Sequence, residues 1–94
     1  MNLTTELVLN HYYKIVPKNE NPYLDDVGEC ATLIGITEKK GCKLLIFDNT
    51  HSFIKENENT IRQFVSLGFG NTETEEKIGN QEYELYTWND YVLK

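Results

Sequence analysis

The clearest pattern in the sequence is a pair of apolar stretches separated by a short polar segment. Residues 27–37 and 42–48 are rich in apolar and β-branched residues, and Glu38-Lys39-Lys40-Gly41 lies between them. Two such runs around a short turn that contains glycine are typical of a β-hairpin. Because apolar residues occupy both faces of the runs, we expect this hairpin to be central and largely buried.

The predicted turn also determines how the two strands of the hairpin pair. A four-residue turn at 38–41 places Ile34 opposite Leu45 and Leu33 opposite Ile46. A change in register would change every cross-strand neighbour, so this pairing is a specific prediction. We expect these four residues to lie in the core.

Upstream of the hairpin, residues 12–16 are mostly aromatic and β-branched, which favours a strand. Pro17 has no amide hydrogen to donate to a neighbouring strand, so the strand is expected to end there. Residues 3–10 fit both the period of a strand and that of a helix. They are therefore either a short helix or an extension of the strand, and residues 18–26 form a polar loop.

Downstream of the hairpin, a helix is predicted at 59–67. Ile61, Phe64 and Val65 have the spacing of one helical face, with a capping residue before them and a glycine after them. Apolar residues also alternate over 61–69, which leaves a strand as the alternative. The other elements expected in this half are a short strand at 51–55, a polar and acidic loop at 70–81, and a last strand at 82–88.

Length and composition indicate one small domain. The chain has 94 residues, of which 39% are hydrophobic and 12% aromatic, enough for one modest core and too many for a disordered chain. Residues 1–94 are therefore expected to form a single mainly β or α+β domain. The N-terminus has neither a basic region nor an apolar run, and no apolar stretch approaches the ~20 residues that cross a bilayer. The expected location is the cytoplasm.

Acidic residues are concentrated in the second half of the chain. The formal net charge is −6, with six acids and five bases up to residue 47 and nine acids and four bases after it. An acidic chain repels phosphate, so direct binding to nucleic acid is not expected. The charge fits either an ordinary solvated surface or a protein partner with a basic surface.

No residues have the spacing of a known catalytic, metal or nucleotide site. The chain contains two histidines and two cysteines, whereas a transition-metal site usually needs three or four ligands. Cys30 and Cys42 lie inside predicted strands and do not face each other, so both are expected to be reduced thiols. We therefore predict no cofactor, no metal and no enzymatic activity.

One segment has a recognisable local pattern. The acidic stretch Asn21-Pro22-Tyr23-Leu24-Asp25-Asp26 is followed by Val27-Gly28-Glu29-Cys30-Ala31-Thr32-Leu33-Ile34, which leads into the hairpin. This segment resembles small SH3-like barrels, including KOW-type domains. The resemblance implies a partly open barrel of about five strands, and partners such as RNA, ribosomes or polymerase. In its heavy use of Asn, Lys, Ile, Tyr and Glu, the chain also resembles small accessory proteins of bacteriophages.

The last predicted strand combines acids and aromatics on one face. In a strand, Tyr83, Leu85 and Thr87 share one face, and the residues between them share the other. If the first face meets the core, the second exposes aromatics, which anchor protein interfaces, together with acids, which guide a basic partner. The predicted partner-binding residues, including those of the preceding loop, are Glu73, Glu75, Glu76, Glu82, Glu84, Tyr86 and Trp88. Tyr12 and Tyr23 are further exposed aromatics that are able to cluster with Trp88, unless Trp88 turns inward.

Three functions fit these patterns. The first is a non-enzymatic protein-binding module, such as a phage inhibitor that mimics nucleic acid and occupies a basic surface of a host protein. The second is an SH3-like accessory domain that binds RNA, DNA or a ribonucleoprotein through Lys39, Lys40 and Lys43. The third is a small enzyme that uses Cys30 or His51. A homodimer is also compatible with exposed strand edges.

Overall fold

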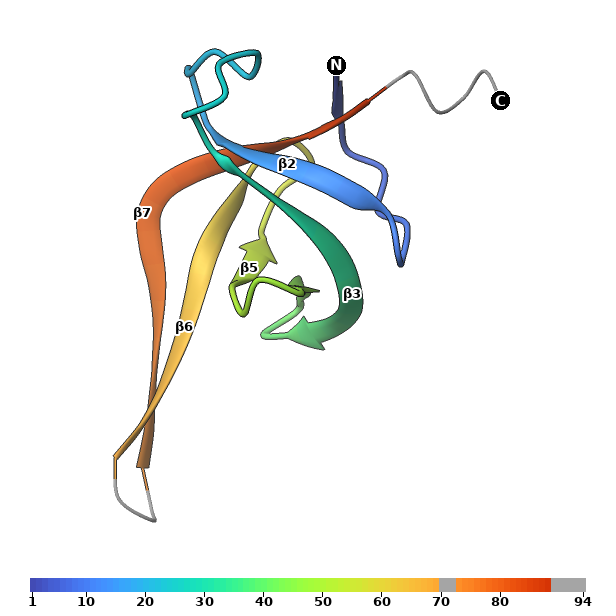
Figure 1. The fold of residues 1–94 in the computed structure, drawn as a ribbon. Coiled ribbons are helices and arrows are strands. Elements are labelled where there is room, and N and C mark those ends of the chain that lie inside the picture. Colours follow the sequence, from blue (N-terminus) through green and yellow to red (C-terminus); the bar gives the residue numbers. More distant parts are fainter. Residues whose placement is uncertain (70–72, 89–94) are drawn as a thin grey trace.

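The computed structural model describes residues 1–69 and 73–88, with side chains described for residues 1–66 and 76–88. Within these residues the chain forms antiparallel β-strands and no helix (Figure 1). The strands are β1 (Asn2–Thr4), β2 (Tyr12–Pro17), β3 (Glu29–Lys39), β4 (Cys42–Phe47), β5 (Ser52–Lys55), β6 (Ile61–Phe69) and β7 (Glu73–Thr87). The prediction of a mainly β protein is confirmed, and no helix long and apolar enough to span a membrane occurs in the part described.

All strands belong to one sheet, in which β7 has neighbours on both sides. The order is β1-β7-β2-β3-β4-β5-β6, and β6 also pairs with β7. The first part of β7 lies against β6, and its last part lies against β2 and β1. Tyr83 is the point of transfer, because it is the Cα partner of both Ile61 and Pro17. β7 bends strongly along this course (Figure 1).

The core lies between the inner faces of these strands. Its side chains come from β2 to β7 and are at most 3% exposed: Tyr13, Ile15, Ala31, Leu33, Leu45, Phe47, Phe53, Ile61 and Leu85. The aromatic rings meet edge to face, with ring centroids 6.4 Å apart for Tyr13 and Phe47 and 5.8 Å apart for Phe47 and Phe53. Full burial of each large apolar side chain contributes roughly 1.5–3 kcal/mol, so this cluster accounts for much of the stability.

The hairpin of β3 and β4 is present, but its predicted register is wrong. Its turn has two residues, Lys40 and Gly41, with φ angles of 54° and 78°. Positive φ at both positions is typical of the type I′ turn, whose twist matches that of paired strands. Leu45 is consequently opposite Ile36, two residues further along than predicted.

An irregularity in β3 explains which predicted core residues are buried. The pairing shifts between Leu33 and Gly35, where Ile34 is the extra residue of a β-bulge. Leu33 and Leu45 are fully buried as predicted, Ile46 is half-buried, and Ile34 is 52% exposed. The prediction of Ile34 as a core residue is therefore wrong.

The predicted helix at 59–67 is also wrong, because this segment belongs to strand β6. The alternation of apolar residues over 61–69 is the pattern that the structure follows. The acidic segment from residue 73 to residue 81, predicted as a loop, is the first part of β7 and pairs with β6. The far parts of β6 and β7 form a two-stranded ribbon that projects from the rest of the molecule (Figure 1). The longest dimension of the whole molecule is 50 Å.

The N-terminal segment is strand only at residues 2–4, where β1 lies beside the end of β7. The chain then crosses to β2 and is held there by the hydroxyl group of Tyr13. This hydroxyl accepts a hydrogen bond from the amide of Val8 at 2.9 Å and donates one to the carbonyl oxygen of Glu6 at 3.0 Å. Residues 3–10 are thus neither the short helix nor the strand extension expected from the sequence, but the end of β1 followed by an anchored crossing.

Candidate functional site

The last part of β7 presents two different faces. Leu85 is 3% exposed and Tyr83 packs against the core cluster, so this face is turned inward as predicted. The residues that alternate with Tyr83 and Leu85 lie on the other face and are half-buried: Glu82, Glu84 and Tyr86. The strand therefore carries acids and an aromatic residue on its outer face.

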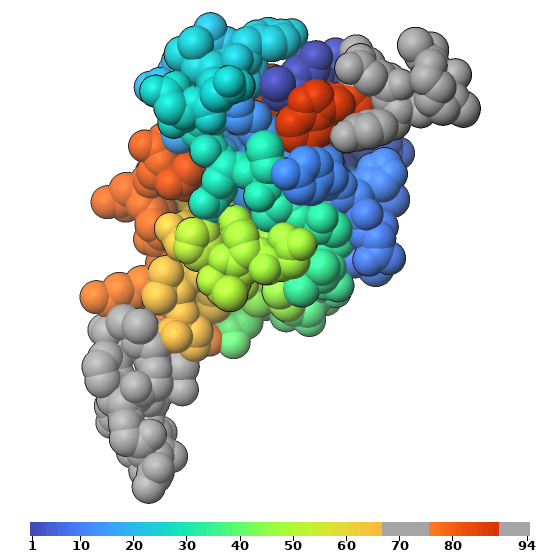
Figure 2. All heavy atoms as spheres, viewed as in Figure 1, coloured from blue at the N-terminus to red at the C-terminus, as the bar shows by residue number. Residues whose placement is uncertain are grey.

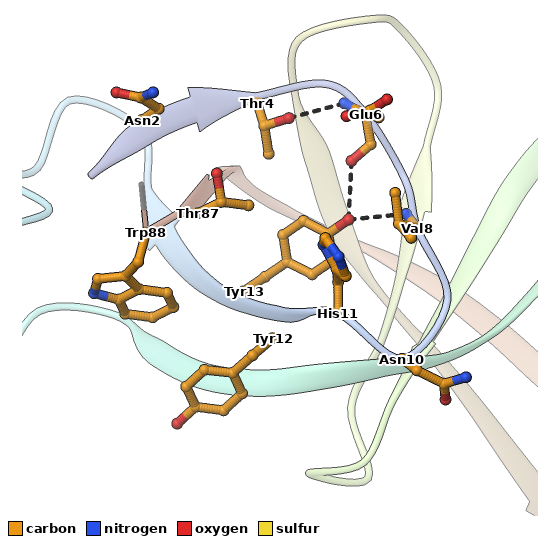
Figure 3. Close-up of a pocket in the computed structure, with 10 residues that line it drawn as sticks. All are labelled: Asn2, Thr4, Glu6, Val8, Asn10, His11, Tyr12, Tyr13, Thr87 and Trp88. Carbon is orange, nitrogen blue, oxygen red and sulfur yellow. Dashed lines mark hydrogen bonds between the residues drawn. The ribbon is translucent and has the colours of Figure 1, made fainter. Parts of the chain in front are cut away.

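Trp88 stacks on Tyr12 at the outer edge of this face. The two ring centroids are 5.4 Å apart and the ring planes differ by 19° (Figure 3). Trp88 is half-buried and Tyr12 is 48% exposed, so the stack remains open to solvent on one side. Because the stack holds both rings in place, a partner would meet a rigid aromatic surface rather than two mobile side chains.

Tyr86 joins this stack to the N-terminal strand. Its Cα partners are Leu3 on β1 and Lys14 on β2. Burial, followed by the negative charge of Glu84, raises the pKa of the Tyr86 hydroxyl, which is hydrogen-bonded to the Glu84 side chain. Tyr86 therefore stays neutral over the physiological range and contributes an uncharged ring to the surface.

Tyr23 completes the group from the loop between β2 and β3. It is 66% exposed, it interacts electrostatically with Tyr86, and its hydroxyl donates a hydrogen bond to the Met1 carbonyl oxygen at 3.2 Å. Figure 2 shows the red end of β7 between the blue N-terminal part of the chain and the cyan loop. We call this group the aromatic surface, and its residues are Leu3, Tyr12, Tyr23, Tyr86 and Trp88.

The loop that carries Tyr23 is fixed by a buried lysine. Lys14 is 5% exposed, and its ammonium group donates hydrogen bonds of 2.8 Å to the carbonyl oxygens of Pro22 and Leu24. These bonds satisfy part of a charge that would be costly to bury alone. Lys14 thus holds the loop against the outer face of β2 and β7.

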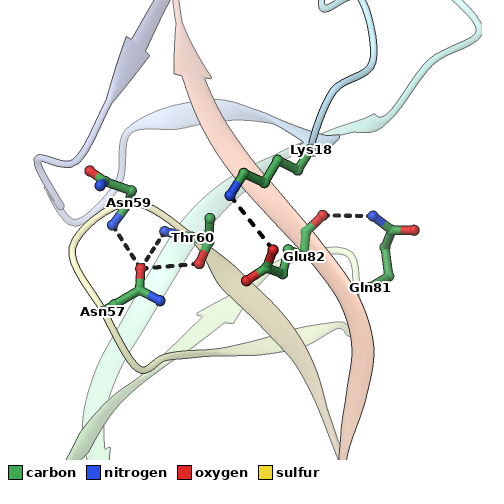
Figure 4. A network of polar contacts seen from close by, with 6 residues as sticks. All are labelled: Lys18, Asn57, Asn59, Thr60, Gln81 and Glu82. Atoms are coloured by element: carbon green, nitrogen blue, oxygen red, sulfur yellow. Dashed lines mark hydrogen bonds and ion pairs between the residues drawn. The ribbon is translucent and has the colours of Figure 1, made fainter.

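Two of the predicted partner-binding acids have partners within the protein. Glu76 forms ion pairs with Lys39 at 2.6 Å and Lys40 at 3.4 Å, and the hydrogen bond from Lys39 is the main cause of its lowered pKa. Glu82 lies 3.7 Å from the ammonium group of Lys18 (Figure 4). Their charges are therefore partly neutralised before any partner approaches.

Three other acids accompany residues of the aromatic surface, either through a hydrogen bond to Tyr86 or in the loop of Tyr23. Within the described part of the chain, Glu84, Asp25 and Asp26 have no cationic partner, and the two aspartates follow Tyr23 in the same loop. The sequence predicts binding acids after residue 48, and among those whose side chains are described, Glu84 contacts the aromatic surface through its hydrogen bond with Tyr86. The predicted residues Glu73 and Glu75 are strand positions of β7 whose side chains lie outside the described residues.

A pocket of about 470 Å³ adjoins the stack (Figure 3). It lies between the N-terminal segment and the adjoining ends of β2 and β7, and Tyr12, Tyr13 and Trp88 contribute its aromatic wall. Glu6, Asn10 and His11 are among the polar residues that line it. The pocket is thus mixed in character, with apolar rings on one side and hydrogen-bonding groups on the other.

The residues considered for enzymatic chemistry lie on β3, on β4 and just before β5. Cys30 is exposed on β3 and Cys42 is half-buried beside the turn to β4. His51 is bonded through Nδ1 to Glu29 Oε1 at 2.8 Å, a contact between residues 22 positions apart that no local sequence signal indicates. Within residues 1–69 and 73–88, no three metal-binding side chains come together.

Comparison with known proteins adds no relative to this description. The chain matches no protein-family model, no curated protein and no solved structure. The aromatic surface is therefore identified by its geometry alone.

Proposed function

We propose that this protein is a non-enzymatic protein-binding module whose aromatic surface receives a basic segment of a partner protein. The observation that carries the proposal is the open stack of Tyr12 on Trp88, with unpaired acids nearby. Rigid, partly exposed aromatic side chains are the usual anchors of protein interfaces. Acids around them attract lysine and arginine and speed the approach of a basic partner.

The fold inferred for this module is a small SH3-like barrel. Support comes from the strand order, in which the pairing of β6 with β7 gives every strand from β2 to β7 at least two neighbours. A module of this kind acts by occupying the basic surface of its partner. Where that surface binds nucleic acid, the module would act as an inhibitor.

The alternative of direct nucleic-acid binding has less support. It relied on Lys39, Lys40 and Lys43 as a basic patch, and two of these lysines are paired with Glu76. A neutralised patch gains little from counterion release, which is the main driving force for binding phosphate backbones.

Capture from a bacterial lysate followed by titration of the purified partner tests the proposal. We expect Trp88→Ala to weaken binding at least about tenfold, since truncation of a hot-spot aromatic residue typically costs ~2 kcal/mol or more. Charge reversal of Glu84, Asp25 and Asp26 to lysine should weaken it further and reduce its salt dependence. Ile34→Ala, which removes an exposed apolar side chain on another strand, should leave the affinity unchanged. Equal affinities of wild type and Trp88→Ala would contradict the proposal.

A further inference from the structure

We propose a second binding site, separate from the aromatic surface, that receives a guanidinium group beside Glu29 and His51. A pocket of about 280 Å³ opens there, near the end of β2 opposite to the Tyr12–Trp88 stack. Ile15 and Phe53 form its buried floor together with the ring of Tyr83, and Glu29, His51 and Gln63 line its mouth. Apolar pockets with a few convergent polar groups are the usual form of a ligand site.

The carboxylate of Glu29 is held in one position at this mouth. Its Oε1 atom accepts a hydrogen bond of 3.0 Å from the side-chain amide of Asn49 and is 2.8 Å from Nδ1 of His51. Asn49 in turn accepts a hydrogen bond from the amide of His51 through its Oδ1 atom. These contacts explain the fixed position of Oε1, whereas Oε2 has no protein partner among the described residues.

The charge at the pocket favours a cation. The contact with Glu29 requires a hydrogen on Nδ1 of His51, because a carboxylate oxygen can only accept. No lysine or arginine of the described residues lines the pocket. The net charge of −6 adds a general attraction for cations.

The aromatic floor favours guanidinium over other cations. The rings of Phe53 and Tyr83 meet edge to face with centroids 5.4 Å apart, and both line the pocket. A guanidinium group is planar, stacks on aromatic faces and donates to a carboxylate, whereas an ammonium group is a strongly hydrated point charge. The free Oε2 of Glu29 and the ring of Tyr83 supply these two contacts together.

The test is an NMR titration of the full ¹⁵N-labelled chain with N-acetylarginine amide. We expect saturable shifts at the backbone amides of Gly28 and Glu29 and at the side-chain amide of Gln63, with a dissociation constant on the order of 1 mM. Glu29→Gln keeps an acceptor for Asn49 and His51 but removes the charge, and should weaken binding by about tenfold or more. Glu38→Gln removes an exposed acid elsewhere and should bind as the wild type does.

Two comparison ligands make the outcome decisive. N-acetylcitrulline amide has nearly the same shape without the charge and should cause no saturable shift. N-acetyllysine amide should bind more weakly than the arginine compound. Absence of saturation with the arginine compound, equal binding of any comparison ligand, or equal affinity of Glu29→Gln would overturn the proposal. Trp88→Ala should not change this titration. The titration therefore tests the second site independently of the proposed function of the aromatic surface.

Discussion

Gly28 shows how a single position limits this fold. Its φ angle is +75°, a conformation that residues with a side chain rarely adopt. A Cβ atom at this position would lie 2.4 Å from the carbonyl oxygen of Ile15 on β2. The loop that carries Tyr23 therefore returns to β3 by passing directly over the β2 backbone, and only glycine allows this approach.

Replacement of Gly28 should consequently destabilise the protein more than replacement of a glycine in an open position. We expect Gly28→Ala to lower the free energy of unfolding by roughly 2–4 kcal/mol through backbone strain and the contact with Ile15. Gly79→Ala is the matched control, since its Cβ would be 3.7 Å from the nearest atom. Urea denaturation followed by circular dichroism compares the two variants, and a similar loss in both would contradict this explanation.

At the scale of elements, the turn between β3 and β4 is tied to β7 by charge. Lys39 and Lys40 both contact Glu76, and the Lys39 ammonium lies 6.0 Å from the ring centroid of Phe64. The turn and the base of the ribbon are distant in sequence, so these contacts fix how the hairpin meets the ribbon.

This contact predicts part of the pH dependence of stability. Because the pKa of Glu76 is lowered in the folded protein, the contribution of this carboxylate to folding stability is fully present above its ordinary pKa of 4.5. The contribution is lost as the pH falls through the lower folded pKa. Glu76→Gln should therefore be less stable than the wild type near pH 7 and should lose less stability on acidification. Urea denaturation between pH 7 and pH 3 measures this, and Glu38→Gln, which removes an exposed acid, should retain the acid dependence of the wild type.

Several elements followed from the sequence because their signals are local. The strands at 12–17 and 52–55 combine β-branched and aromatic residues with turn residues at their ends. The alternation along 82–88 correctly grouped Tyr83 with Leu85 on one face, and the structure turns both toward the core. Alternation depends on only a few consecutive residues, so it can be recognised in the sequence even when the partner strand is not known.

Other features depend on residues far apart in the sequence and could not be predicted. The local pattern favoured a helix at 59–67 and allowed a strand at 61–69, and the pairing with β7 decided for the strand. The pairing of Glu76 with Lys39 and Lys40 and the contact of Glu29 with His51 exist only once the sheet has formed. The stack of Tyr12 on Trp88 was anticipated as a cluster, but its geometry depends on the pairing of β2 with β7.

At the scale of the whole molecule, the ribbon of β6 and β7 is an extension of an otherwise closely packed sheet. Beyond the pairs that β6 makes with β5, its only neighbour in the sheet is β7. Among the described side chains, β6 contributes only Ile61 to the core cluster and β7 contributes only Leu85. The rest of both strands, which includes the ribbon, contributes none. The core should therefore form without the far end of the ribbon.

A shortened chain tests this separation. Ser66 and Glu76 are Cα partners, so residues 67–75 can be replaced by an Asn-Gly turn of the type that suits two-residue hairpins. We expect the variant to unfold cooperatively, with a melting temperature within about 5 °C of the wild type. Leu85→Ala, which removes a core side chain, should lower stability by about 2–5 kcal/mol. Loss of cooperative unfolding in the shortened chain would show that the ribbon supports the core.

The position of β7 determines when this sheet can be completed during synthesis. β2 to β6 pair with neighbours close in sequence, and these hairpins can form as each strand leaves the ribosome. The partner of Ile15 is Leu85 and that of Leu3 is Tyr86, and both partners are made after β2 to β6. Until then the inner faces of β2 and β6 lack their neighbour and expose apolar side chains that favour aggregation. The nascent chain therefore keeps this apolar surface uncovered until β7 has been made and has paired with β2 and β6.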